Sequence, residues 1–182
     1  MSAYAVLRTR LNQYFLLSYL LILLTCLGFL RLTDLSTARS TGFALAVYLS
    51  YGALYLLPAW GLARLSLAAS RGRWPGLVWT LAVLGTGLIQ ILLVTDYTVF
   101  TMFSFHLNGF VWNLLTTPGG IESMGGGADT ELSVAALMTG LLLLQGGLLV
   151  LLLKARFLSR LLDGVNTPRL RRSVVGALVV LA

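Results

Sequence analysis

Residues 77–95 read LVWTLAVLGTGLIQILLVT and contain no charged side chain. A helix needs about 20 mainly apolar residues to cross the hydrocarbon core of a bilayer. Three other stretches of this kind occur at 14–30, 42–62 and 132–153. Together they predict an all-α fold, a polytopic membrane helical bundle with four complete transmembrane helices.

The composition of the whole chain agrees with a membrane protein. The 182 residues are 58% hydrophobic and only 10% charged, a balance that excludes a soluble globular domain. The single cysteine, Cys26, lies in an apolar run, so no intrachain disulfide is expected. The net charge of +7 comes from basic residues that flank apolar segments without a platform of stacking aromatics, and we therefore expect no nucleic-acid partner.

A fifth apolar run starts at residue 174 and reaches residue 182. At about 1.5 Å per residue it is too short to cross the membrane, so we expect the start of a fifth helix in which the chain stops. Residues 1–182 are thus predicted to form one N-terminal transmembrane domain.

The positions of the basic residues predict the orientation. Of the 13 Lys and Arg residues, all except Arg31 and Arg39 fall on one side if the N-terminus is cytoplasmic. Cytoplasmic loops of membrane proteins retain positive charge. The pattern predicts a multi-pass protein of the bacterial inner membrane with a cytoplasmic N-terminus.

The segment between the third and fourth spans, residues 96–131, reads DYTVFTMFSFHLNGFVWNLLTTPGGIESMGGGADTE. Its first part places apolar side chains at helical spacing, which predicts an amphipathic helix over 97–115 in the outer interface. The Gly-rich part after Pro118 predicts a turn back into the fourth span.

His106 is the only histidine, and it lies in this outer segment. A metal site needs three or four ligands and a catalytic base needs a nucleophile. Asp96 and Glu122 are the only nearby carboxylates in the sequence, and their spacing matches no metal motif. We expect no metal site and no catalytic residue here, but an interfacial histidine that bonds another domain, a backbone carbonyl or a lipid headgroup.

Inside the predicted spans, Gln90 stands out as a strongly polar side chain and is expected to form an interhelical hydrogen bond. Small residues within the spans allow helices to approach closely. They are Gly85, Ala136, Gly140, Gly146 and Gly147, and we expect them to pack within one bundle, with a dimer interface as the alternative.

The outer segment also carries a family resemblance. Asp96, Val99, Phe100 and Phe103, followed by His106-Leu107-Asn108 and Val111-Trp112, resemble the membrane domain of inner-membrane sulfatase-like proteins of Gram-negative bacteria. These belong to the lipoteichoic-acid-synthase-like branch of the alkaline phosphatase superfamily. The resemblance implies five membrane helices, a linker and a periplasmic sulfatase-like domain, here expected after residue 182.

The resemblance implies a division of roles. The nucleophile and metal ligands of the superfamily belong to the periplasmic domain, so this chain is expected to hold no cofactor, while a divalent metal would belong to that domain. A full-length protein of this kind would be a hydrolase, a phosphoglycerol- or phosphoethanolamine-type transferase, or a degenerate fold. The interfacial motif that would meet the periplasmic domain comprises Asp96, Phe103, His106, Leu107, Asn108 and Trp112.

The loop after the fourth span is strongly basic. Clusters of this density beside a span attract anionic headgroups, although they also serve to fix topology. The residues expected to bind anionic lipids are Lys154, Arg156, Arg160, Arg169, Arg171 and Arg172.

The sequence therefore predicts a non-catalytic membrane anchor and lipid-sensing module of a sulfatase-like envelope protein. By resemblance it would take part in lipopolysaccharide or glycerophospholipid homeostasis, with membrane lipids, its own periplasmic domain and an inner-membrane regulatory protein as partners. One alternative is a small membrane transporter or channel. Another is an intramembrane lipid-modifying enzyme that uses His106 with Asp96 or Glu122.

Overall fold

The computed structural model describes residues 2–33, 35–109, 113, 117–118, 128–155 and 162. Its elements are α1 (Ala3–Thr25), the 3-10 helix η1 (Cys26–Leu32), α2 (Ala38–Ser70), α3 (Pro75–Phe103) and α6 (Ala128–Lys154). α1 with η1, α2, α3 and the segment Leu132–Lys154 are each long and apolar enough to cross a membrane. The predicted all-α class with four membrane helices is confirmed.

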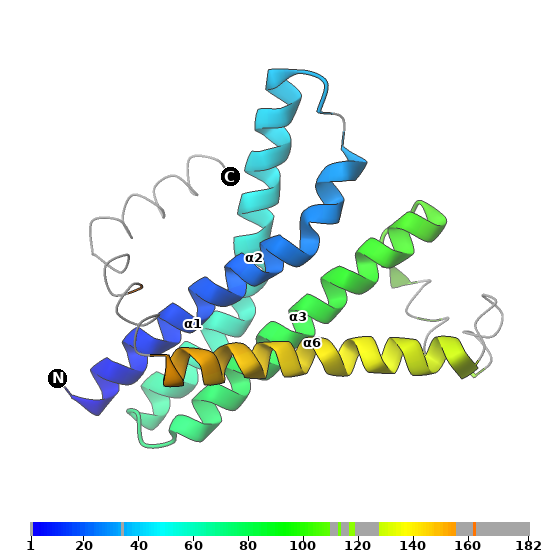
Figure 1. Ribbon diagram of the computed structural model, residues 1–182. Helices are drawn as coiled ribbons and strands as arrows, with labels where there is room; N and C mark the ends of the chain where they lie inside the picture. Colours follow the sequence, from blue (N-terminus) through cyan, green and yellow to red (C-terminus); the bar gives the residue numbers. More distant parts are fainter. Residues whose placement is uncertain are drawn as a thin grey trace.

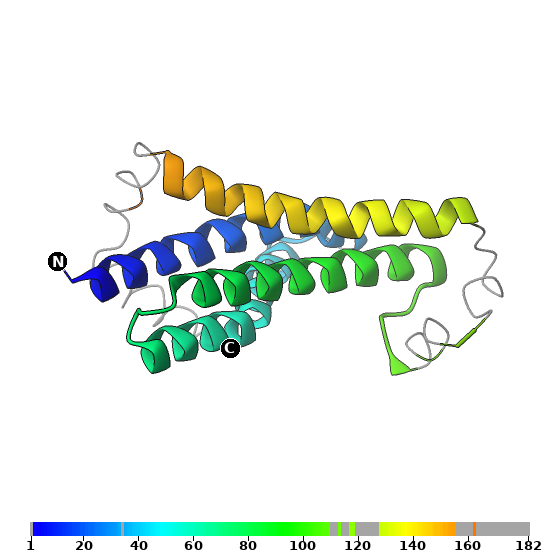
Figure 2. The same ribbon diagram turned by 90° about the horizontal axis from the view of Figure 1, so that it is seen from below.

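The helices run alternately up and down (Figure 1). One end of the bundle, the N-terminal end, holds the start of α1, the α2–α3 turn and the end of α6. The opposite, distal end holds η1, the start of α2 and the end of α3. α6 packs against α1 and α3, and α2 packs against the same two helices from the other side (Figure 2). At the distal end, η1 and α2 diverge from α3 (Figure 1).

Each helix extends beyond the apolar run that predicted it. At several ends, polar side chains outside the run cap the helix by bonding its free backbone groups. The Ser2 side chain accepts a hydrogen bond from the Ala5 N–H, so α1 begins at Ala3 rather than near Tyr14. Thr37 and Ser40 form a capping box at the start of α2. Pro75 occupies the first turn of α3, as its fixed φ favours.

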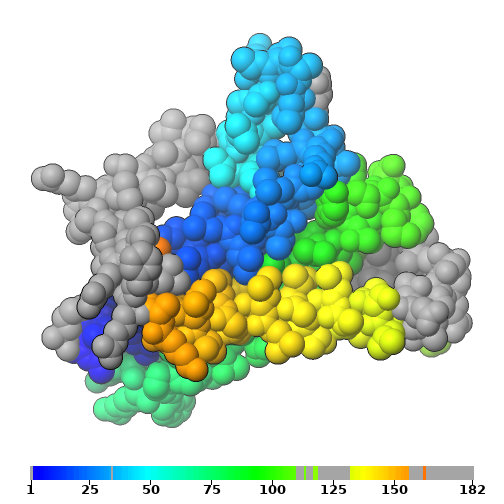
Figure 3. Space-filling model, viewed as in Figure 1, coloured from blue at the N-terminus to red at the C-terminus, as the bar shows by residue number. Residues whose placement is uncertain are grey.

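Small residues bring α2 and α3 together near the N-terminal end. A Cβ atom added at Gly85 would lie 2.8 Å from the Cβ of Ala59, a distance that real Cβ atoms do not reach. The expectation that Gly85 packs inside the bundle is therefore confirmed. It is wrong for Gly140, Gly146 and Gly147, since a Cβ on each would meet open space among the described residues. Many large apolar side chains of α6 are exposed, among them Leu132, Leu143 and Leu151. Figure 3 shows α6, in yellow to orange, lying along one face of the molecule.

The predicted interfacial helix over 97–115 is wrong as a single element. Residues 97–103 are the last two turns of α3, because no proline or glycine interrupts the helix after Thr95. Thr98 and Thr101 donate their hydroxyl protons to the carbonyls of Val94 and Thr98, which the helix tolerates. Ser104 then ends α3 in the left-handed region at φ 59°, and residues 104–108 are not helical.

Several predictions fall on residues outside the described part of the chain. They concern Trp112, Glu122, the basic residues Arg156, Arg160, Arg169, Arg171 and Arg172, and the fifth apolar run at 174–182. Lys154 is described, and it is exposed at the end of α6.

Candidate functional site: an apolar cavity beside an Asp–His pair

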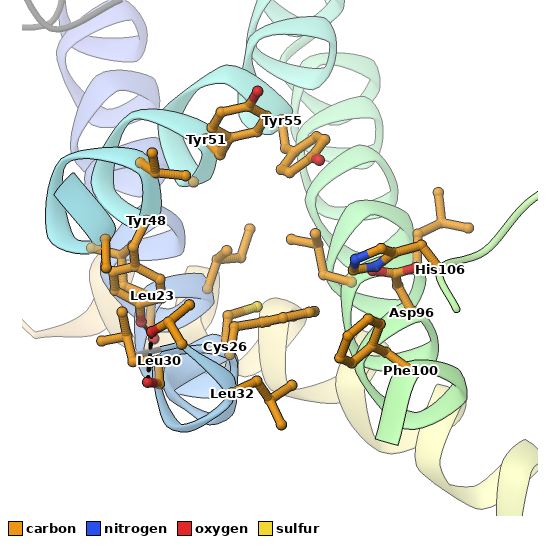
Figure 4. A pocket seen from close by; sticks show the side chains of 18 of the residues that line it. Leu23, Cys26, Leu30, Leu32, Tyr48, Tyr51, Tyr55, Asp96, Phe100 and His106 are labelled. Carbon is orange, nitrogen blue, oxygen red and sulfur yellow. Dashed lines mark hydrogen bonds and ion pairs between the residues drawn. The ribbon is translucent and has the colours of Figure 1, made fainter. Parts of the chain in front are cut away.

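An apolar cavity of about 950 Å³ lies at the distal end, where η1 and α2 diverge from α3. Leu23, Cys26 and Leu30 line it from α1 and η1, and Tyr51 and Tyr55 line it from α2 (Figure 4). This volume is at the upper end of the range for pockets that hold drug-sized ligands, about 300–1,000 Å³. The sequence did not predict this cavity.

The cavity is partly open at the surface of the bundle. Several of its lining side chains are strongly exposed, with Phe43 71% and Leu92 46% exposed. These side chains lie on helices that are long and apolar enough to cross a membrane.

Asp96 and His106 lie at the α3 side of the cavity, across it from Leu23 and Tyr48 (Figure 4). The left-handed turn at Ser104, whose N–H bonds the Phe100 carbonyl at 2.8 Å, reverses the chain direction. His106 therefore returns toward α3 and contacts a residue ten positions earlier. The sequence identified these two residues but could not show that they are in contact.

The carboxylate of Asp96 uses both oxygens to hold the returning chain. Its Oδ2 lies 2.8 Å from Nδ1 of His106, and its Oδ1 accepts the Leu107 N–H at 2.6 Å. The imidazole also stacks on Phe100, with 4.5 Å between ring centroids. We refer to Asp96, Phe100, His106 and Leu107 as the Asp96 clasp. It fixes the orientation of the imidazole, whose side chain remains 62% exposed.

An imidazole oriented by a carboxylate can donate or accept a proton through its second nitrogen. It can equally donate a hydrogen bond to an anionic oxygen when both nitrogens carry protons. In the described part of the chain there is no group of three His, Cys, Asp or Glu residues that could hold a metal ion.

Only part of the predicted interfacial motif comes together in the structure. Asp96, His106 and Leu107 form one site, whereas Phe103 points elsewhere and stacks on Phe105 with ring centroids 5.7 Å apart. Asn108 is exposed beside this site. Trp112 lies outside the described residues.

A second polar feature lies inside the bundle, between α1, α3 and α6. Gln145 accepts hydrogen bonds from the hydroxyls of Tyr14 at 3.1 Å and Ser18 at 3.0 Å, and its amide nitrogen donates to Oε1 of Gln90 at 2.8 Å. Thr86 lies 2.8 Å from the Tyr14 hydroxyl, and Gln90 reaches Thr25 at 3.4 Å. We call these six residues the buried polar network.

The buried polar network confirms that Gln90 forms interhelical hydrogen bonds. It also shows residues that the sequence reasoning missed. Gln145 lies inside the most leucine-rich span, and Tyr14 lies at the start of the first apolar run; both side chains are fully buried. A search for polar side chains at matching depths of different spans would have found Gln90 and Gln145 together.

These features define a multi-pass α-helical membrane protein with an apolar cavity at one end of its helical bundle. Residues 7–180 match the family described as a domain of unknown function, DUF3413, and the chain belongs to that family. No curated protein and no solved structure matches the chain.

Proposed function

We propose that this chain is a lipid-binding membrane module of a sulfatase-like protein of the bacterial inner membrane, with a cytoplasmic N-terminus. In this proposal it anchors an extramembrane, periplasmic domain and contributes no catalytic residue. The outer segment resembles that of the protein YejM, also called PbgA. A role in lipopolysaccharide or glycerophospholipid homeostasis, with an inner-membrane regulatory partner, rests on that resemblance alone.

The observation that carries lipid binding is the apolar cavity. Its volume of about 950 Å³ and its exposed apolar rim suit a hydrocarbon chain, and it opens where lipid would lie. The cavity therefore favours a membrane lipid over a soluble metabolite.

The distribution of charge supports the proposed orientation. In the structure the described basic residues gather at the N-terminal end, where the start of α1, the α2–α3 turn and the end of α6 meet (Figure 1). Examples are Arg8, Arg71, Arg73 and Lys154, whereas only Arg31 and Arg39 of the described part lie at the distal end. The positive-inside rule assigns the N-terminal end to the cytoplasm.

One observation favours a second candidate function. The Asp96–His106 pair orients an imidazole at the cavity, which is the arrangement that a lipid-modifying enzyme would need for proton transfer. Turnover of a lipid by the purified chain, abolished in His106→Ala, would favour this enzyme over a non-catalytic module.

The lipid-binding proposal can be tested by filling the cavity. Ala44 lines the cavity from α2, and its neighbour Leu45 is exposed but does not line it. We expect Ala44→Phe to lose lipids that the purified wild-type chain retains in native mass spectrometry, and Leu45→Phe to retain them. Equal retention by both variants would count against a lipid in this cavity.

The orientation is tested separately with reporter fusions. Alkaline phosphatase, which is active only in the periplasm, is expected to be active when fused after Asn108 and inactive when fused after Arg73. The opposite pattern would overturn the proposed orientation.

A further inference from the structure

We propose that the cavity binds one acyl chain of an anionic glycerophospholipid from the distal leaflet, with Arg31 and Arg39 binding its phosphate and His106 beside its headgroup. This inference rests on the proposed lipid-binding function and names the lipid class, the leaflet and the headgroup residues.

The depth of the cavity matches one leaflet. Along α3 its lining residues run from Ile89 to Phe100, and Phe100, eleven positions after Ile89, lies about 16 Å further along the helix. The hydrocarbon core of a bilayer is about 30 Å thick, so each leaflet contributes about half of it. The cavity thus spans the depth of a single leaflet and is closed off from the other by the packed N-terminal half of the bundle.

The polarity of the lining changes along this depth. Ile22, Leu23, Ile89 and Leu93 line the cavity toward the centre of the bundle. At the distal end the lining includes the polar side chains of Thr33, Ser40, Asp96 and His106. An acyl chain with its tail toward the centre and its headgroup at the distal end would match this gradient.

Two arginines flank the distal end of the cavity. Arg31 lies in η1 between Leu30 and Leu32, which both line the cavity, and Arg39 directly precedes Ser40, which also lines it. Both arginine side chains are exposed, and among the described residues neither forms an ion pair. A guanidinium binds phosphate through paired N–H donors, so these two positions suit a lipid phosphate.

The placement of Arg31 and Arg39 also runs against the charge pattern of the chain. In the described part, the other Lys and Arg residues lie toward the N-terminal end. These two arginines are exceptions to the positive-inside pattern, and binding of an anionic headgroup would give them a role.

The experiment uses the full chain in nanodiscs of equal amounts of phosphatidylglycerol and phosphatidylcholine with the same acyl chains. A small fraction of phosphatidylglycerol carries a photoactivatable group in its acyl chain. Crosslinks to cavity-lining peptides are counted relative to crosslinks on the exposed face of α6, which reports lipids that surround any membrane helix. Unlabelled phosphatidylglycerol or phosphatidylcholine then competes for the cavity.

For the wild-type chain we expect crosslinks in the peptides around Leu23 and Leu92, displaced by phosphatidylglycerol at lower concentration than by phosphatidylcholine. The double variant Arg31→Gln, Arg39→Gln should lose this preference by about tenfold to thirtyfold, since each basic residue contributes about 1 kcal/mol near a charged surface. Arg73→Gln removes one charge at the opposite end and should leave the preference unchanged.

The outcomes separate the two proposals. If Ala44→Phe abolishes the cavity crosslinks while the double arginine variant keeps the preference for phosphatidylglycerol, the anionic-lipid inference is wrong and lipid binding survives. If Ala44→Phe leaves the crosslinks unchanged, both are wrong, and a protein segment rather than a lipid would be the candidate occupant. Crosslinks distributed equally over the cavity and α6 would also overturn the inference.

Discussion

The two halves of this bundle use their helices in opposite ways. In the N-terminal half, side chains such as Leu11, Tyr14, Ala63 and Val78 are fully buried, and the buried polar network joins three helices. In the distal half α1 with η1, α2 and α3 diverge and line a cavity with an exposed apolar rim. One half holds the helices together, and the other half is where we propose that a lipid binds.

The boundary between the halves lies on α2 near Pro58. Ala59 packs on Gly85 on one side of this proline, while Tyr55 lines the cavity on the other. Proline donates no backbone hydrogen bond, so the carbonyl of Leu54 lacks its usual helical partner. Helices bend readily at such a position. From Pro58 toward its N-terminal start, α2 moves away from α3 (Figure 1).

The stability of the N-terminal half, which we call the closed half, should be most sensitive to the loss of Gln145. Within a bilayer the hydrophobic effect does not drive helices together, so hydrogen bonds between them matter. Gln145→Leu leaves the Ser18 hydroxyl and the amide oxygen of Gln90 without this partner, and it leaves Thr86 as the remaining partner of the Tyr14 hydroxyl. We expect a loss of about 2–3 kcal/mol in the free energy of unfolding, measured by denaturation in mixed detergent micelles.

The control for this variant is Leu143→Ala, because Leu143 is on the same helix and 70% exposed. It should change stability by less than about 0.5 kcal/mol. A double variant with Gln90→Leu should be less destabilised than the sum of its single changes, since the two amides share a hydrogen bond. Additive effects would show that the network does not act as a unit.

A paired glycine substitution tests the helix packing of the closed half. Gly85→Ala places a Cβ 2.8 Å from the Cβ of Ala59 and should destabilise the bundle by about 1–2 kcal/mol. Gly146→Ala makes the same chemical change where the structure has open space, and it should be neutral or stabilise by up to about 1 kcal/mol. Thermal unfolding in detergent compares the two. Equal effects would mean that α2 and α3 are not in close contact at Gly85.

The sequence predicted the number and order of the membrane helices, because hydropathy reports which segments can lie in lipid. It did not predict where the helices end. Ser2 and Thr37 start helices outside the apolar runs, and α3 continues to Phe103 through residues whose spacing suited an interfacial helix equally well. The left-handed turn at Ser104 has no signature in the sequence, since serine rarely adopts it.

The site was predictable only in part. Asp96 and His106 could be singled out as rare polar residues in an apolar segment, but their contact depends on the turn at Ser104. The cavity depends on the divergence of α2 from α3, which is a property of helix packing rather than of any one segment. Gln145 was overlooked because leucines surround it and its partners lie in other helices.

The smallest expected effect on stability concerns the Asp96 clasp, which belongs to the distal half. Asp96→Ala removes the acceptor of both His106 and the Leu107 N–H, but the clasp lies at the edge of the bundle, and His106 is largely exposed. We expect the global stability to change by less than about 1 kcal/mol, while the Leu107 amide exchanges with solvent deuterium about fivefold faster. Thr98→Ala, which removes a hydroxyl bonded only within α3, is the matched control and should leave this exchange rate unchanged. An unchanged exchange rate in Asp96→Ala would mean that the Ser104 turn and the Phe100–His106 stacking are sufficient to hold the returning chain. The carboxylate would then orient the imidazole without holding the backbone beside the cavity.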